Sequence, residues 1–243
     1  MSGNEQLALT ARDRQVLQEV QRHGAVTRHQ LLRLKLFASK TRANDRLRRL
    51  AATGYLRARP QPLIAGGPRL VYFPGPALTG SQVRNHLRDS SELFLEHHLG
   101  IVDLRIAFEQ HSKVLRWLSE KDLAPLSLGV VPDAYVEYER DGLSFSAFIE
   151  YDRGTEPLGR IEAKARAYAA LAFSGTFQQK FGRKYFRALF VTDTTRRLQT
   201  MSRAVARVTN RVVHLSTLEP VTTSGPFAAI WTRPGDQVPQ SLT

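Results

Sequence analysis

The sequence predicts a mixed helix-and-strand protein, α+β or α/β in class, with a small N-terminal module followed by a larger domain. Over the first fifty or so residues, apolar side chains recur at helical spacing. From residue 130 onward, short apolar or alternating runs typical of strands take turns with helical stretches. Phe73-Pro-Gly-Pro76 favours a turn and marks a boundary between the two parts.

Charge indicates the kind of partner. The 243 residues contain 35 Lys and Arg against 22 Asp and Glu, a net charge of +13, and this balance favours a polyanion. Residues 1–60 hold 13 of these basic residues and 4 of the acidic ones, a net of +9, which leaves +4 for the rest. The surface that faces a polyanion is therefore expected in the N-terminal module.

Several protein classes are disfavoured by the sequence. It has no apolar run of about eighteen residues, no signal-peptide pattern near residue 1 and no cysteine. We therefore expect a cytoplasmic, nucleoid-associated protein without a membrane partner, without disulfides and without thiolate metal sites.

Three helices are predicted in the N-terminal module. Thr10 with Asp13 is typical of a helix start, and Gly24 is typical of its end. A second short helix follows from Thr27. Ser39 is expected to cap a third helix, which buries one apolar face and exposes basic and amide side chains.

A hairpin is predicted after the third helix. Residues 55–59 and 69–73 have the pattern of strands around the turn residues 65–68. Three short helices followed by a hairpin, with basic residues on the third helix, resemble a bacterial winged helix-turn-helix, and residues 46–56 resemble the passage from its recognition helix to its wing. The resemblance implies binding to double-stranded DNA, with the third helix in the major groove.

The residue types on the third helix and the hairpin suggest different roles at DNA. Arg42 and Asn44 are types that read base edges, whereas the other basic residues more often hold phosphates. The predicted DNA-binding residues are Lys40, Thr41, Arg42, Asn44, Arg46, Arg48, Arg49, Arg57, Arg59 and Arg69. The alternatives are a solvated basic helix, or a winged helix that contacts protein.

The larger domain is predicted in the order αβββαβαβ. The expected elements are a helix over 91–108, strands near 114–118, 130–138 and 143–151, a helix over 160–173, a strand over 185–191, a helix over 195–208 and a strand over 212–215. Asp141-Gly142 is typical of a hairpin turn. The predicted divisions of the chain are 1–76 (DNA-binding domain), 77–111 (helical connector), 112–232 (the αβββαβ domain) and 233–243 (a loose tail).

Three carboxylates are expected to meet at one end of this sheet. Asp133 opens one strand, while Glu150 and Asp152 share a face at the end of the next. Such a cluster is costly to desolvate and needs a compensating cation, either a metal or a Lys or Arg side chain. Oxygen ligands suit Mg²⁺ or Mn²⁺, which activate water for phosphodiester hydrolysis. The alternative is a simple salt bridge to Arg153 or Arg160.

Pro132-Asp133 and Glu150 on adjacent strands of an αβββαβ domain resemble the PD-(D/E)XK nuclease fold of restriction and repair enzymes. The lysine position of that family holds Asp152 here, but some members move the lysine to the following helix, where Lys164 lies. The resemblance implies that Asp133, Glu150, Asp152 and Lys164 are catalytic and that the three carboxylates bind the metal. Members often add a glutamate from the first helix, for which Glu92 and Glu96 are candidates.

The sequence also resembles a family that is narrower than the PD-(D/E)XK nucleases, over roughly residues 8–218. The helical link with Glu96-His-His-Leu99, the segment Glu150-Tyr-Asp-Arg-Gly-Thr155 and a following helix with Lys164 and Tyr168 resemble the replication-relaxation family. This resemblance implies a role in the replication, maintenance or regulation of plasmids, phages or integrative elements.

Two functions stay open at this point. One is a double-stranded DNA-binding protein that keeps a nuclease-like domain without its chemistry and needs no cofactor. The other is an endonuclease that depends on Mg²⁺ or Mn²⁺. A homodimer and replication or mobilisation proteins are further partners to consider.

Overall fold

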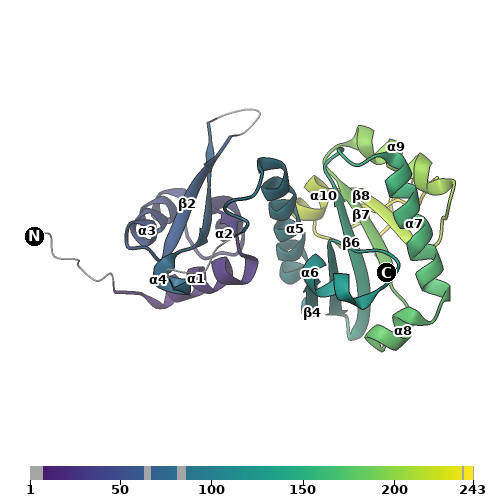
Figure 1. The fold of residues 1–243 in the computed structure, drawn as a ribbon, viewed down its shortest axis with the longest axis horizontal. Helices are drawn as coiled ribbons and strands as arrows, with labels where there is room; N and C mark the ends of the chain where they lie inside the picture. Colours follow the sequence, from purple (N-terminus) through teal and green to yellow (C-terminus); the bar gives the residue numbers. More distant parts are fainter. Residues whose placement is uncertain (1–7, 63–66, 81–85, 237, 243) are drawn as a thin grey trace, which may run out of the picture. The chain divides into compact units, whose positions relative to one another are not determined.

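The computed structural model describes residues 8–62, 67–80, 86–236 and 238–242. The chain divides into two compact units, Met1–Ile106 and Ala107–Thr243, here called the N-terminal and C-terminal units (Figure 1). The division falls inside the helical region that the sequence predicts as a connector over 77–111. In the described parts of the chain, no helix is both long and apolar enough to cross a membrane.

The N-terminal unit combines helices with a small antiparallel sheet. Its main elements are α1 (Ala11–His23), β1 (Val26–Thr27), α2 (Arg28–Arg33), α3 (Lys40–Ala52), β2 (Leu56–Gln61) and β3 (Arg69–Pro74). The sheet order is β1-β3-β2. The short helix α4 (Pro76–Thr79) and the start of α5 (Glu92–His111) follow. Part of the predicted turn at 65–68 lies outside the described residues.

Side-chain caps start the helices at the predicted residues. Thr10 and Asp13 form a capping box, in which the Thr10 Oγ1 accepts from the Asp13 amide at 3.2 Å and the Asp13 Oδ2 accepts from the Thr10 amide at 2.6 Å. The Ser39 Oγ accepts from the Arg42 amide at 3.3 Å. The buried faces of these helices share one apolar core, which includes Val16, Val20, Leu31, Leu47, Leu50, Leu56 and Tyr72.

Two side chains predicted to face DNA are used inside this unit instead. The Arg46 Nε donates to the Asp13 Oδ1 at 2.6 Å, and its Nη2 binds the other oxygen of a carboxylate that is 1% exposed. The Asn44 Oδ1 accepts from the Arg28 Nη1 at 2.7 Å. The expectation that Arg46 and Asn44 are exposed is thereby corrected. A carboxylate buried at the start of α1 requires a cation, and Arg46 on α3 is the side chain that supplies it.

The C-terminal unit is built on a mixed five-stranded sheet in the order β4-β5-β6-β7-β8. The strands are β4 (Lys113–Ser119), β5 (Ala134–Arg140), β6 (Leu143–Asp152), β7 (Arg187–Thr192) and β8 (Val213–Thr217). The β4–β5 and β5–β6 pairs are antiparallel, whereas β6, β7 and β8 run parallel. This confirms the predicted mixed α and β class, and the main elements follow the predicted order αβββαβαβ.

Helices complete the C-terminal unit. They are α7 (Leu158–Phe173), α8 (Thr176–Phe181), α9 (Thr195–Ala206), the short α6 (Glu120–Leu123) and α10 (Leu218–Thr223), and a 3-10 turn over Ala124–Leu126. Helices α7 and α9 pack against each other (Figure 1). Beneath them lies an aromatic-rich core, in which the centroid of the Phe148 ring is 5.5 Å from that of Tyr168 and 5.0 Å from that of Phe186.

Strand β6 positions the candidate site. Asp141 and Gly142 adopt left-handed backbone angles, φ 51° and 75°, and form the predicted hairpin turn between β5 and β6. In this hairpin Ala134 pairs with Ile149. The residue before β5, Asp133, therefore lies beside the carboxyl end of β6, where Glu150 is found.

The tail after Thr232 differs from the sequence-based expectation of a loose segment. Gln240 exchanges both backbone hydrogen bonds with Trp231, at 3.1 and 2.7 Å. Leu242 is 3% exposed. A backbone bridge and the burial of one leucine therefore hold the described part of the tail against the C-terminal unit.

Replacing Arg46 by alanine is expected to destabilise the N-terminal unit. The Asp13 carboxylate would stay buried without its cation, which costs about 3 kcal/mol. Urea unfolding of Arg46→Ala, with Arg48→Ala as the control, measures this cost. The Arg48 side chain is 74% exposed in a pair with Asp45, and its loss should change stability by less than about 0.5 kcal/mol. Equal stabilities of the two variants would contradict a structural role for Arg46.

Candidate functional site: a buried carboxylate at the end of β6

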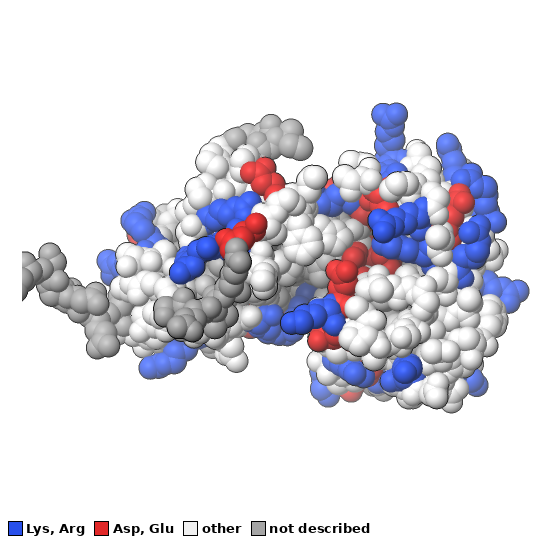
Figure 2. All heavy atoms as spheres, in the orientation of Figure 1, with Lys and Arg blue, Asp and Glu red and all other residues white. Residues whose placement is uncertain are grey.

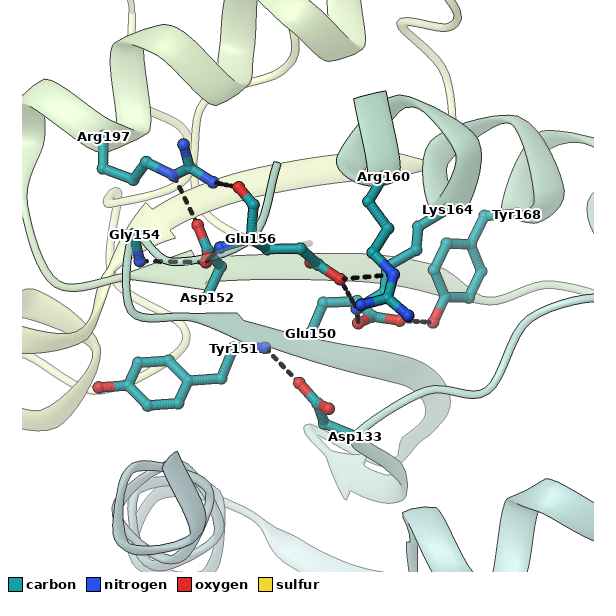
Figure 3. A network of polar contacts seen from close by, with 10 residues as sticks. All are labelled: Asp133, Glu150, Tyr151, Asp152, Gly154, Glu156, Arg160, Lys164, Tyr168 and Arg197. Atoms are coloured by element: carbon teal, nitrogen blue, oxygen red, sulfur yellow. Dashed lines mark hydrogen bonds and ion pairs between the residues drawn. The ribbon is translucent and has the colours of Figure 1, made fainter. Parts of the chain in front are cut away.

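Glu150 lies at the centre of the site. Its side chain comes from the central strand β6 and is 3% exposed. The Lys164 Nζ donates to its Oε2 at 2.8 Å, and the Tyr168 Oη donates to its Oε1 at 2.5 Å (Figure 3). Lys164 and Tyr168 lie four residues apart on α7 and so share one helix face. Both oxygens of the buried carboxylate therefore have a donor.

Asp133 adds a second carboxylate near Glu150. Its Oδ2 accepts the Tyr151 amide hydrogen at 2.7 Å, which fixes the side chain at the end of β6 (Figure 3). Burial, and then the charge of Asp133, raise the pKa of Glu150 to about 8. The opposing effects of Lys164 and Tyr168 are smaller. The site therefore holds a carboxyl group that binds a proton more readily than a carboxyl group in water.

The donors to Glu150 also have shifted pKa values. Burial lowers the pKa of Lys164, but the carboxylates of Glu150, Asp133 and Glu156 outweigh burial and raise it overall. Burial and the adjacent Glu150 raise the pKa of Tyr168. Lys164 is therefore a stable cation, and the Tyr168 hydroxyl keeps the proton that it donates.

Asp152 takes part in a different set of contacts. The Arg197 Nε donates to its Oδ2 at 2.6 Å, and the amides of Gly154 and Glu156 donate to its Oδ1 at 3.0 and 3.1 Å (Figure 3). These bonds hold the turn between β6 and α7 and direct the carboxylate toward Arg197 on α9. Asp152 is therefore a structural anchor of that turn.

The structure thereby divides the predicted three-carboxylate cluster. Asp133, Glu150 and Lys164 come together, whereas Asp152 is directed to Arg197. Within the described ranges, no three or more His, Asp or Glu side chains are grouped closely enough to hold a metal ion. The expected three-ligand metal site of Asp133, Glu150 and Asp152 is corrected to two carboxylates beside a lysine.

Those two carboxylates still fit a hard divalent cation. Mg²⁺ binds oxygen ligands and often takes one or two carboxylates from the protein, with substrate phosphates and water completing its shell. Asp133 and Glu150 supply that number and type of donor, because a carboxylate has about four lone-pair sites and the bonds to Lys164 and Tyr168 use two of those on Glu150. A cation beside them would also offset the burial and mutual repulsion that raise the pKa of Glu150.

Some members of the site were missed in the sequence. Glu156 bridges Lys164 at 3.1 Å and Arg160 at 3.7 Å, and Arg197 secures Asp152. The spacing of four residues between Glu156 and Arg160 is a signal that the sequence carries. Arg197 has no comparable signal, because α9 brings it to Asp152 from 45 residues away.

The salt-bridge alternative considered for the acidic cluster also differs from the structure. Arg160 pairs with Glu156, as above, and the Arg153 Nε lies 3.6 Å from the Asp193 carboxylate. The cation that meets Glu150 is Lys164.

The predicted helix-one glutamates belong to the N-terminal unit. Glu96 pairs with Arg69 at 2.9 Å, and Glu92 is exposed at the start of α5.

The predicted DNA-binding residues fall into two groups. Those exposed on α3 are Lys40, Thr41, Arg42, Arg48 and Arg49, and Arg57 on β2 is half-buried. Asn44, Arg46, Arg59 and Arg69 are engaged within the unit. Arg59 donates to the carbonyl oxygens of Arg88 and Ser90. Arg69 donates to the Gln61 side chain at 2.9 Å.

Comparison with known proteins identifies the family. The family model described as replication-relaxation matches residues 17–184. The chain belongs to the replication-relaxation family. No curated protein matches this member of the family. Among solved structures, the restriction endonuclease FokI bound to DNA is similar with 16% identity and a TM-score of 0.32, over 86% of this chain and 43% of that chain. The chain thus spans less than half the length of FokI, and a similarity this low assigns no function to it.

The raised pKa of Glu150 predicts a pH dependence of stability. Because folding raises this pKa from 4.5 to about 8, the folded protein binds more protons than the unfolded chain between these values. The contribution of Glu150 is therefore fully present below about pH 4.5 and is lost as the pH rises through 8. Melting temperatures of the wild type and Glu150→Gln, measured from pH 5 to 8.5, should show the wild type losing stability relative to the variant. Parallel pH profiles would contradict the raised pKa.

Proposed function

We propose that this replication-relaxation protein is a double-stranded DNA-binding protein that acts in the replication, maintenance or regulation of a plasmid, phage or integrative element. In this proposal the N-terminal unit is a winged helix-turn-helix. The observation that carries the proposal is the exposed face of α3, which presents Lys40, Arg42, Arg48 and Arg49 while the opposite face is buried in the core.

The geometry of the N-terminal unit suits this role. Helix α3 has 13 residues and is therefore about 20 Å long, and the major groove of DNA admits one helix. Its core-facing residues Ala43, Leu47 and Leu50 are fully buried, so the helix cannot rotate its cations away from solvent. The β2–β3 pair supplies the wing. Arg57 lies on β2, the strand that follows α3, and its side chain is half-buried.

The cations already engaged inside the unit have a different part in the proposal. Arg59 and Arg69 tie the wing strands to α5 and to the segment before it. We assign them to holding the wing in place, and we assign phosphate contacts to the exposed residues. The candidate base readers are reduced to Arg42, because Asn44 already accepts from Arg28.

DNA binding is expected to depend on the exposed arginines of α3. Arg42→Ala/Arg48→Ala should weaken binding to duplex DNA by about ten-fold or more, and the loss of the Arg48 phosphate contact should lower the slope of log affinity against log salt by about 1. Fluorescence anisotropy with labelled duplexes at several salt concentrations measures both effects.

The matched control is Arg14→Ala/Arg22→Ala. Both residues are exposed on α1, and Arg22, like Arg48, forms a weak ion pair with an acidic residue three positions away. The two variants therefore lose the same charge and the same kind of pair. Equal affinities of the two variants for DNA would rule out α3 as the DNA-binding helix.

A second candidate function is a divalent-metal-dependent endonuclease. The observation that favours it is the convergence of Asp133, Glu150 and Lys164 at one end of the sheet. Asp133 and Glu150 would hold the metal, which when bound supplies activation of water and neutralisation of phosphate charge. Lys164, a cation held beside them, stabilises negative charge that develops on a phosphate.

The surroundings of the acidic site are compatible with a nucleic-acid substrate. Figure 2 shows Lys and Arg side chains gathered over α7 and α9, with Asp and Glu side chains between them. Arg160, Arg166, Arg196 and Arg203 on these helices are exposed. In either function, these cations offer the phosphate backbone a second contact region besides α3.

Plasmid cleavage separates the two functions. If the protein is an endonuclease, the wild type should nick or cut supercoiled plasmid with Mg²⁺ or Mn²⁺. Glu150→Gln and Asp133→Asn should each reduce the rate by at least about 10- to 100-fold, the loss typical of residues that only orient a metal ligand. Gel electrophoresis measures the products, and the α3 variant Arg42→Ala/Arg48→Ala tests dependence on DNA binding. Intact plasmid that is retarded by the wild type and by the Glu150 and Asp133 variants, but less by the α3 variant, would support DNA binding alone and reject the endonuclease.

A further inference from the structure

A basic pocket lies at the opposite end of the same sheet from Glu150. It is formed where β6 begins and where the parallel strands β7 and β8 begin, with residues of the C-terminal tail on one side. Its volume is about 640 Å³, within the range of small-molecule sites. The pocket is separate from the acidic site, which lies at the carboxyl end of β6.

The pocket is lined by an unusual concentration of positive charge. Its described lining contains Arg183, Lys184, Arg187, Arg211 and Arg233, and no Asp or Glu is among those lining residues. Arg183 also pairs with Glu137, a carboxylate just outside the lining, at 3.2 Å. Cations gathered in one hollow repel one another, and a bound anion relieves that repulsion.

Two of the cations are held in place by aromatic rings. The Arg187 guanidinium lies 5.4 Å from the Phe145 ring, and the Lys184 ammonium lies 5.3 Å from the Tyr185 ring. Tyr185 is itself 74% exposed, so most of its side chain faces solvent. The pocket therefore combines charges with a flat aromatic surface at its edge.

A buried polar atom adds to this picture. His214 is 7% exposed, and its Nδ1 has no hydrogen-bond partner among the described residues. Burial, together with Arg187 and Arg233, lowers the pKa of His214 to about 4. The positive charges of the pocket thus also act on the buried His214 ring in its lining, which stays neutral at physiological pH.

We propose that this pocket binds the phosphate of a nucleotide, either free or at the end of a nucleic-acid strand. The guanidinium groups of Arg211 and Arg233, both exposed at the rim, bind phosphate oxygens through charge-assisted hydrogen bonds. Tyr185 offers its ring to the base, because stacking on an aromatic side chain accepts any base. The proposal rests neither on the DNA-binding role of α3 nor on the metal chemistry of Glu150.

Binding of three probes to the full chain tests the proposal. The probes are thymidine monophosphate, a short oligothymidine with a 5′-phosphate and the same oligothymidine with a 5′-hydroxyl. Titration calorimetry is used for the mononucleotide, and fluorescence anisotropy is used for the strands. All measurements are made in the Arg42→Ala/Arg48→Ala background, so that the α3 surface contributes little and a failure of the α3 proposal is seen separately.

The matched variants remove charge inside or outside the pocket. Arg211→Ala/Arg233→Ala removes two rim cations, and Lys113→Ala/Lys121→Ala removes two exposed cations from β4 and α6 of the same unit. We expect the pocket variant to bind the phosphorylated probe about ten-fold or more weakly than the parent protein, and the control to change this affinity by less than about two-fold. Arg211→Lys/Arg233→Lys should restore part of the affinity. Melting temperatures confirm that all variants are folded.

The outcomes separate the two sources of the phosphate. Tighter binding of the 5′-phosphorylated strand than of the other two probes supports a strand end, and equal binding of the phosphorylated strand and the mononucleotide supports a free nucleotide. Tyr185→Ala should lower the affinity for every probe that binds in the pocket. Absence of binding by all three probes, or equal affinities in the pocket variant and the control, would overturn the proposal.

Discussion

The need to satisfy one buried carboxylate constrains the C-terminal unit. Glu150 lies near the end of the central strand, where almost no solvent reaches it, and a carboxylate in such a place is tolerated only with close donors. Helix α7 supplies Lys164 and Tyr168. The helix face that presents these donors also packs the Tyr168 ring against Phe148. Core packing and site geometry are therefore one arrangement.

The two ends of the mixed sheet have opposite chemistry. At the carboxyl end of β6, Asp133 and Glu150 bring negative charge together, and the adjacent Lys164 compensates part of it. At the start of β7 and β8, Arg187, Arg211 and Arg233 bring positive charge together around a pocket. Parallel strands make this separation possible, because all their starts lie at one edge and all their ends at the other.

The arginines of the N-terminal unit divide between structure and surface. Arg46 neutralises a carboxylate that is almost fully buried, and Arg59 and Arg69 tie the wing strands to neighbouring segments. Arg42 and Arg48 extend from the same helix as Arg46 but face solvent. The number of arginines in the sequence is therefore larger than the number that a polyanion can contact, and only the exposed arginines are assigned to the proposed function.

The sequence by itself determined the element types, the main order of elements in both units and the Asp141-Gly142 turn, because hydrophobic period, caps and turn residues act over a few neighbouring positions. The sequence also predicted that Asp133 lies near Glu150, because the position of the hairpin turn fixes which residues of the two adjacent strands face each other. Only the tertiary structure decided that Asp152 bonds Arg197 and that Arg46 bonds Asp13. Those partners lie 45 and 33 residues apart, and the packing of helices on one another and on the sheet, which no local pattern records, brings them together.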